Sequence, residues 1–254
     1  MSILSYHAVD DTSALPIAVG SRSFAHHASW LAKHRRVLPL TEATGRLSSS
    51  CRLPKGIAAI TFDDGFASVY DNAVPVLLRY NLPATIFLVA ATLAPDGHPV
   101  DWVDQPVAQP SLKSLSIEQV LEMQTMGIDF GSHSYDHRDL TTLSDHECER
   151  DLIDSRMLLE DLLKQRIQYV AYPRGRHDER VRRAARRAGY GAGFAMALGR
   201  DSIGPYAVPR MGVYRHDTAL SIGLKASPAY VRIRTGSTYR TLRRMLARAS
   251  PGAA

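Results

Sequence analysis

Ala59-Ile60-Thr61-Phe62-Asp63-Asp64-Gly65 is the stretch that decides the fold. The apolar run Ile57 to Phe62 lies between two glycines, which is typical of a strand in a parallel sheet covered on both faces. Two carboxylates end it. Neighbouring side chains on a strand point in opposite directions, so one can bind a metal while the other handles a proton. Alone, Asp-Asp-Gly is more often a solvated turn.

A second motif strengthens the functional interpretation. Gly131-Ser132-His133-Ser134-Tyr135-Asp136-His137 follows another short apolar run, residues 128–130. Two imidazoles four residues apart can converge on one ion, and neutral histidine with carboxylate is a common zinc ligand set. Taken alone, such a pair is a weak signal, because loop histidines are often ordinary surface residues. Together with Asp63 and Asp64 it predicts a metal site.

The rest of the chain alternates between apolar strands and amphipathic helices. Strands are expected at residues 2–6, 57–62, 84–89, 128–130, 168–171 and 190–196, and helices at 23–34, 67–80, 116–127, 144–165 and 178–188. Capping boxes at Ser116 and Ser144 and an Asp178 cap mark three helix starts. Strand followed by helix with short connections predicts parallel strands in a barrel-like α/β sheet. One domain over residues 1–229 and a basic tail over 230–254 are expected.

Bulk composition narrows the class of protein. The chain has 254 residues, 45% of them hydrophobic, which suits one large core. Cys51 and Cys148 lie far apart without C-x-x-C spacing, so neither a disulfide framework nor a cysteine zinc site is expected. No leader pattern and no apolar stretch of about 18 residues is seen, which predicts a cytoplasmic protein.

The charge is positive and uneven. The net charge is +6 and the sequence pI about 9.4, with arginines crowded at 180–187 and 232–248. Solvated helix faces are one interpretation. The other is attraction to an anionic partner, such as a nucleotide- or lipid-linked sugar phosphate, or peripheral membrane contact through the tail. No zinc finger, RNA-binding signature or helix-turn-helix pattern is present, so no nucleic-acid partner is expected.

The motifs T-F-D-D-G and H-S-Y-D-H make the chain resemble the polysaccharide deacetylases, the NodB-homology family of carbohydrate esterases. The resemblance covers about residues 3 to 213. The Tyr6-His7 start and Ala171-Tyr172-Pro173 resemble the exopolysaccharide branch. It implies a distorted (β/α) barrel and a hydrolase that removes an N-acetyl group from an amino sugar and releases acetate.

The resemblance also implies roles for the motif residues. Asp63 is the base, while Asp64, His133 and His137 hold a divalent ion, zinc first, with cobalt, nickel, manganese or iron as alternatives. The tetrahedral oxyanion would be stabilised by the ion and by the backbone N–H of Arg174, since the preceding proline has no N–H.

Two departures from the family pattern leave roles to be filled. Ala171 stands where the family has an arginine that orients the base, and Arg210 is the candidate to replace it. The general acid is assigned to His7 or His216, with His7 favoured because it follows a predicted barrel strand.

Substrate contacts are expected from a long loop and from the motifs. The proline-rich loop at residues 94–115 contains Trp102, a candidate for stacking on a sugar ring. Tyr135, Tyr172 and Pro173 are further candidates for substrate binding.

The sequence therefore predicts a metal-dependent N-deacetylase with an N-acetylated sugar substrate inside the cell. Two alternatives remain open. One is hydrolysis of another amide, a cyclic imide or an ester at the same site. The other is a carbohydrate-binding protein without catalysis, against which the retention of both Asp63 and Asp64 argues.

Overall fold

The structure is a computed structural model that describes residues 2–46, 56–103, 113–197, 204–236 and 239. Its strands are β1 (Ser2–Tyr6), β2 (Ala8–Val9), β3 (Ala18–Val19), β4 (Arg36–Val37), β5 (Ile57–Phe62), β6 (Ala84–Leu88), β7 (Asp129–Ser132), β8 (Tyr169–Ala171), β9 (Ala192–Met196) and β10 (Val208–Gly212). Its helices are α1 (Ser21–His34), α2 (Leu40–Gly45), the π-helix η1 (Val69–Ala73), α3 (Val74–Arg79), α4 (Ile117–Thr125), α5 (Asp145–Leu163), α6 (Glu179–Arg187), α7 (Ala219–Lys225) and α8 (Pro228–Thr235), with short 3₁₀ turns η2 (Ala90–Leu93) and η4 (Pro173–Gly175).

Seven parallel strands form a closed barrel, which confirms the expected fold. The sheet runs β1-β10-β9-β8-β7-β6-β5, and β1 also pairs with β5, so the sheet has no open edge between them. The short strand β4 adds to the beginning of β5 at Ile57 and Ala58. Because all these strands are parallel, their carboxyl ends lie at one mouth of the barrel, where such folds carry their chemistry.

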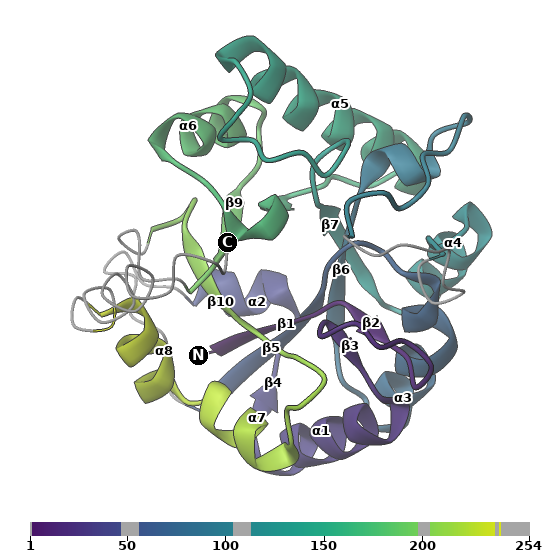
Figure 1. The fold of residues 1–254 in the computed structure, drawn as a ribbon, viewed down its shortest axis with the longest axis vertical. Helices are drawn as coiled ribbons and strands as arrows, with labels where there is room; N and C mark the ends of the chain where they lie inside the picture. Colours follow the sequence, from purple (N-terminus) through teal and green to yellow (C-terminus); the bar gives the residue numbers. More distant parts are fainter. Residues whose placement is uncertain (1, 47–55, 104–112, 198–203, 237–238, 240–254) are drawn as a thin grey trace.

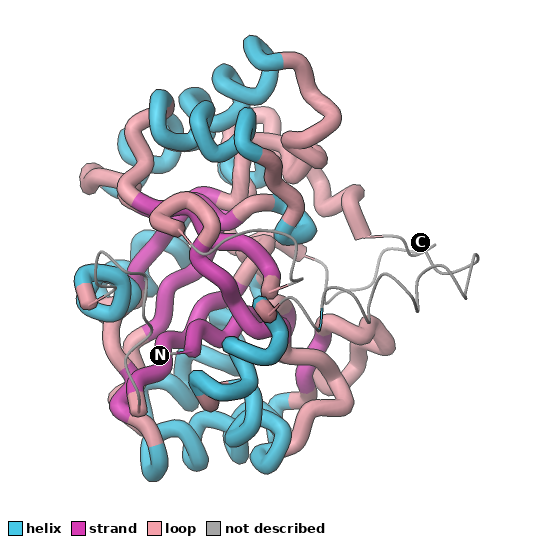
Figure 2. Tube along the Cα trace, turned by 90° about the vertical axis from the view of Figure 1, so that its left-hand side faces the viewer, coloured by secondary structure: helices cyan, strands magenta, loops and turns pink. Residues whose placement is uncertain are grey.

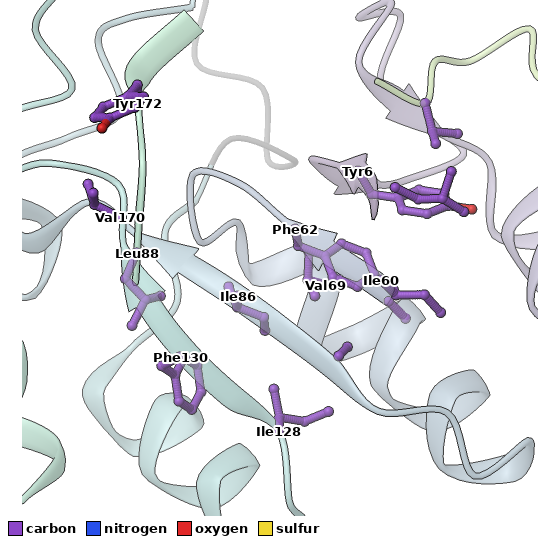
Figure 3. Close-up of a cluster of buried hydrophobic side chains, with 14 of the residues drawn as sticks. Tyr6, Ile60, Phe62, Val69, Ile86, Leu88, Ile128, Phe130, Val170 and Tyr172 are labelled. Carbon is purple, nitrogen blue, oxygen red and sulfur yellow. The ribbon is translucent and has the colours of Figure 1, made fainter. Parts of the chain in front are cut away.

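Helices surround the barrel and bury its outer face. Figure 1 shows α5 and α6 on one side of the strands and α1, α3 and α7 on the opposite side, and Figure 2 shows the strands between these two sets of helices. Ile60, Phe62, Ile86 and Phe130 point outward from their strands into this layer, where η1 contributes Val69 (Figure 3). This outer cluster is the larger part of the hydrophobic core.

The barrel interior is divided between an apolar half and a polar half. Near the strand starts, the inward residues form a cluster with Leu40 and Ala43 of α2, a helix that lies across this mouth of the barrel (Figure 1). Near the strand ends, the buried residues are polar and include Thr61, Asp63 and Arg210. The Arg210 guanidinium carbon lies 5.1 Å from the ring centre of Phe87, so Phe87 separates the two halves.

The helix expected at residues 67–80 is present as a continuous helical run over 67–79. Its middle is the π-helix η1, and Pro75 lies near the start of α3, which follows. Helix α8 spans residue 230, where the tail is expected to begin, and the division into a domain and a tail stays a prediction. Cys51 and residues 237–238 and 240–254 of the expected tail lie outside the described residues. Within the described ranges, no helix is long and apolar enough to span a membrane.

Candidate active site

Asp63 and Asp64 leave the end of β5 in different directions. The Asp63 N–H donates to the Tyr6 carbonyl at 2.9 Å, which continues the pairing of β5 with β1. The alternation of side chains along β5 therefore extends to Asp63, whose side chain faces into the barrel. Asp64 then adopts a left-handed backbone with φ 70°, and Gly65 follows with φ 66°. This sharp turn brings the Asp64 carboxylate, which strand alternation alone would point outward, to the barrel mouth. Both carboxylates are buried.

Arg210 holds the Asp63 carboxylate from the neighbouring side of the barrel. Its Nη1 donates to Oδ1 at 2.6 Å and its Nη2 donates to Oδ2 at 2.7 Å, while Ser5 Oγ adds a third hydrogen bond to Oδ2 at 3.0 Å. Burial raises the pKa of Asp63, but the Arg210 charge and hydrogen bonds outweigh it and hold the pKa well below its usual range. Arg210 therefore occupies the position that the sequence assigned to it.

The two histidines follow β7 and approach Asp64 from the other side. The His133 N–H donates to the Leu88 carbonyl at 2.7 Å, and its ring Nδ1–H donates to the Ala171 carbonyl at 2.8 Å. That hydrogen bond leaves the Nε2 lone pair free to bind an ion. Burial lowers the pKa of His133 to about 4, so the ring is neutral near pH 7, as a metal ligand must be.

Helix α5 supports the loop that carries these histidines. Asp151 Oδ1 accepts the backbone N–H of Tyr135 at 2.9 Å, and Ser155 Oγ donates to the Ser134 carbonyl at 3.0 Å. Ser134 Oγ in turn accepts the His137 N–H. Ser134 and His137 both have left-handed backbones, with φ 72° and 56°. Such strained conformations persist where surrounding contacts hold them, and they gather at functional sites.

The ligand atoms of Asp64, His133 and His137 form a compact cluster. Asp64 Oδ1 lies 3.5 Å from His133 Nε2 and 3.3 Å from His137 Nε2, and one atom from each residue lies within 4.8 Å of the others. Two ligands on a tetrahedral zinc ion are separated by about 3.4 Å. Asp64 Oδ1 is buried and has no hydrogen-bond partner among the described residues. These residues therefore fit a divalent ion, and two nitrogens with one oxygen suit zinc and several neighbouring metals.

A cavity of about 300 Å³ opens beside this cluster. It is lined by His7, Ile17, Asp63, Asp64, Trp102, Val103, His133, His137, Arg174, Gly175, Met196 and Tyr214. His7 Nε2 lies 4.0 Å from Asp63 Oδ2, so His7 and the carboxylate face the same space. The lining combines apolar side chains with charged ones, which suits a small polar group with an apolar end.

Not every predicted site residue lies at this cavity. His216 is exposed and stacks on Tyr214, outside the cavity lining. Tyr172 is fully buried among the helices, where its hydroxyl donates to the Tyr206 carbonyl at 3.0 Å. Pro173 is buried, and half-buried Tyr135 packs against the outer core. These positions do not fit the general-acid role considered for His216 or the substrate contacts expected of the other three.

Arg174 and Trp102 lie at the rim and contact each other. The Arg174 backbone is left-handed, with φ 56°, and its Nη2 donates to the Trp102 carbonyl at 3.3 Å. The Trp102 ring stacks on His137 with centroids 4.8 Å apart and an interplanar angle of 24°. One face of the indole is thus covered by a metal-ligand candidate and cannot stack on a sugar.

Five lining residues, Ile17, Val103, Gly175, Met196 and Tyr214, were not among the predicted site residues. Met196 ends β9, as the expected strand over 190–196 does, so its strand-end position was a signal for it. Tyr214 lies two residues beyond β10, a strand that was not among those expected. Ile17 and Val103 lie in loops, and their residue types give no signal. Ser5 was missed as a partner of Asp63, although it lies one residue before the end of β1.

The fold and the site together define the class: a closed parallel α/β barrel with an arginine-held aspartate beside an Asp-His-His cluster at its carboxyl-end mouth. The sequence model of the polysaccharide deacetylase family matches residues 51–193, more than half of the chain, and the chain therefore belongs to that family. The prediction of a deacetylase enzyme is confirmed at the level of the family.

Individual relatives agree with this placement. The chain is 30% identical over 217 residues to YxkH of Bacillus subtilis, whose name places it among the polysaccharide deacetylases, covering 84% of this chain and 71% of that protein. It is 27% identical over 208 residues to the poly-beta-1,6-N-acetyl-D-glucosamine N-deacetylase of Staphylococcus epidermidis, covering 76% and 67%. The deacetylase PplD of Streptococcus pyogenes has the same fold, with a TM-score of 0.76, 24% identity and 90% and 98% coverage.

Proposed function

We propose that this protein is a metal-dependent deacetylase that removes N-acetyl groups from a polysaccharide of N-acetylated amino sugars. The observation that carries the proposal is the placement of Asp63, held by Arg210, beside the Asp64-His133-His137 cluster in one cavity. The relative from Staphylococcus epidermidis, named for deacetylation of poly-beta-1,6-N-acetyl-D-glucosamine, supports a polymer as substrate. A bound divalent ion, zinc in our proposal, would polarise the acetyl carbonyl and lower the pKa of a bound water.

Asp63 accepts a proton from the attacking water in this proposal. A carboxylate has about four lone-pair sites, and Arg210 and Ser5 occupy three of them, one on Oδ1 and two on Oδ2. A site on Oδ1 therefore remains for water. Because Arg210 fixes both oxygens, the carboxylate needs no reorientation as the reaction proceeds.

His7 donates the proton that the leaving amine requires. It lines the cavity, its side chain is 18% exposed, and its Nε2 lies 4.0 Å from Asp63 Oδ2. A general acid has to reach the leaving group in the substrate complex, which a cavity-lining ring can do and the exposed His216 cannot. The backbone N–H of Arg174 is our candidate donor to the oxyanion, because this residue lies at the cavity wall in a left-handed turn.

The adjacent carboxylates provide a matched test. Acetate release from poly-beta-1,6-N-acetylglucosamine oligomers is measured alongside metal content for the wild type, Asp63→Asn and Asp64→Asn. We expect Asp63→Asn to keep the metal and lose activity by about 10² to 10⁴-fold, the range for general-base catalysis. Asp64→Asn should lose both metal and activity. Full activity of Asp63→Asn, or a wild type that binds metal but releases no acetate from any N-acetylated glycan, would contradict the proposal.

A further inference from the structure

The two metal-ligand histidines are held in different ways. His133 donates its Nδ1–H to the Ala171 carbonyl, which fixes the ring. His137 faces Asp64 with Nε2, and its Nδ1 is buried without a hydrogen-bond partner among the residues that the structure describes. A metal-binding histidine almost always gives its second ring N–H to an acceptor, which orients the ring. His137 lacks this support.

An aromatic ring lies where that support is missing. The Trp102 indole stacks on His137 at 4.8 Å with an angle of 24°, close to parallel. The His133 ring contacts His137 at 4.9 Å and 60°. Rotation of the His137 ring about its bond to Cβ would break the parallel contact with Trp102. The ring is therefore restrained by contact with two neighbouring rings instead of by a hydrogen bond.

The backbone of Trp102 has a contact with the barrel. Arg174 Nη2 donates to its backbone carbonyl at 3.3 Å, and the Arg174 backbone belongs to the η4 turn that follows β8. The loop before it is closed by hydrogen bonds from the Gly97 and His98 N–H groups to the Ala94 and Ala91 carbonyls, at 2.9 and 3.0 Å. The backbone at Trp102 is thus linked to the η4 turn through Arg174.

We propose that Trp102 is a positioning residue for the metal site, which acts through His137 by stacking and takes the place of the missing hydrogen bond. This inference rests on the proposed function, because it assumes that His137 binds a divalent ion. The role differs from the sugar stacking that the sequence predicted, since it uses the indole face that lies on the imidazole. The role can be tested by measuring the affinity for the metal ion, because metal binding does not require substrate or turnover.

The first experiment measures Zn²⁺ affinity by competition with a chromogenic chelator. Trp102→Ala should bind Zn²⁺ roughly three- to tenfold more weakly than wild type, the size expected for loss of an aromatic pair that orients a ligand. Trp102→Phe keeps a ring on His137 and should stay within about twofold of wild type. Trp30→Phe is the matched control, because Trp30 stacks on His34 at 4.6 Å, outside the site. Melting curves of the metal-free proteins check that each variant is folded.

The outcomes separate this inference from the proposed function. A wild type without Zn²⁺ affinity overturns the proposed function and, with it, the site on which this inference rests. A wild type that binds Zn²⁺ while Trp102→Ala binds it equally well overturns this inference alone. Equal losses in Trp102→Phe and Trp102→Ala overturn it as well, because the retained ring would then support nothing.

Fluorescence gives a second, independent readout. The chain has two tryptophans, so Trp30→Phe leaves Trp102 as the only indole emitter. Paramagnetic Co²⁺ bound next to His137 should quench Trp102 emission in Trp30→Phe and leave Trp30 emission unchanged in Trp102→Phe. Saturating Co²⁺ binding without any change in Trp102 emission would contradict the stacked arrangement.

Discussion

At the scale of single residues, the ion pair between Arg210 and Asp63 is the main electrostatic feature of the molecule. Both side chains are almost fully buried, and two parallel hydrogen bonds join them. Removing two charges from water is costly, and only good geometry and further hydrogen bonds offset that cost. Ser5 and Thr61 provide those hydrogen bonds: Ser5 Oγ donates to the carboxylate, and Thr61 Oγ1 accepts from the guanidinium.

Replacing Arg210 should therefore affect both stability and activity. Arg210→Met leaves the Asp63 charge buried without a partner, and we expect the free energy of unfolding to fall by about 3–5 kcal/mol. Acetate release should fall with it, because the carboxylate is no longer held. Arg210→Lys, which keeps the charge but loses the two-pronged contact, should be intermediate in both. Urea unfolding with activity assays measures these effects, and an Arg210→Met enzyme as stable as wild type would contradict the account.

Asp151 makes stability depend on pH. Burial raises its pKa to about 6, despite the Tyr135 N–H that it accepts. A raised folded-state pKa means that its contribution to stability is fully present below about pH 4 and is lost as the pH rises through 6. Asp151→Asn keeps an acceptor for Tyr135 and cannot ionise. We expect this variant to exceed wild type in stability by about 2 kcal/mol at pH 8 and to lose that advantage progressively as the pH falls from 6 to about 4.

The check is urea unfolding of Asp151→Asn and wild type at several pH values between 4 and 8. The difference between the two proteins isolates this one group, because every other titrating residue is shared. A difference that does not change with pH would show that Asp151 is already ionised without cost.

Site residues could be predicted from the sequence where they lie at the end of a predicted strand or directly after it. Asp63, His7 and Arg210 were placed by their positions at or after apolar runs, and the structure brings them to one cavity or to one ion pair. His216 looked equivalent in the sequence, but it is exposed, because the loop after β10 turns its side chain outward beside Tyr214. Which face of a loop a residue occupies depends on tertiary packing, which a local pattern does not contain.

At the scale of elements, α5 does more than cover the barrel. It begins with the capping box formed by Ser144 and Glu147, and its inner face carries Asp151 and Ser155, which hold the histidine loop. The helix that starts at this exposed capping box thus also holds the loop that carries the candidate metal ligands. Its end is less favourable, because Lys164 at the C-cap has a left-handed backbone with φ 51°.

Lys164→Gly should stabilise the protein. Glycine adopts this backbone conformation without steric cost, although part of the gain is lost to the greater freedom of the unfolded chain, so we expect about 0.5–1 kcal/mol. The lysine ammonium donates to Asp161 in an exposed ion pair, which contributes little. Lys164→Ala is the control, since it removes the same side chain but retains the strain. If alanine raised the urea midpoint as much as glycine, backbone strain would not be the cause.

Helix starts were more predictable than helix interiors. The expected caps Ser116, Ser144 and Asp178 each accept a backbone N–H in the structure. Helix α1 begins at Gly20 without a side-chain cap of its own, and Asp11 accepts the Ser21 N–H at 2.9 Å from another loop. A capping residue that directly precedes its helix can be recognised from the local sequence. A capping group supplied by a residue ten positions away cannot be recognised in this way.

At the scale of the whole molecule, the site joins parts of the barrel that are not adjacent. Asp64 follows β5, whereas both histidines follow β7, with β6 between these strands. An ion held by all three would connect two strands of the ring and bind only the folded chain. Metal binding is then coupled to global stability.

Zinc should therefore raise the melting temperature. At 100 times the Kd, binding to the native state alone adds about 2.7 kcal/mol, which for a chain of this size corresponds to roughly 5–10 °C. The double variant His133→Ala/His137→Ala should show no shift, and His26→Ala, an exposed histidine outside the site, should match wild type. Melting curves with and without EDTA measure this, and an equal shift in the double variant would indicate that zinc binds elsewhere.

The sequence predicts a barrel of parallel strands, but it does not show which strands pair to close the barrel. Alternating strands and helices predict parallel neighbours, and β5 to β10 do lie in chain order around the ring. The first strand closes the ring by pairing with both β10 and β5. That contact spans most of the chain, and no local pattern marks it. The short strands β2 and β3 and the helices α7 and α8 were missed because their apolar patterns are only a few residues long.

The direction of β1 has a practical consequence for attaching the enzyme to a support. Residue Ser2 starts this strand at the mouth opposite the cavity, where α2 lies, and the strand rises through the ring to His7 at the cavity. A tether fused ahead of Ser2 would therefore present the cavity toward the solution. Immobilisation through this end should leave access for a long polymer chain, whereas a bulky group placed near Arg174 or Trp102 should obstruct it.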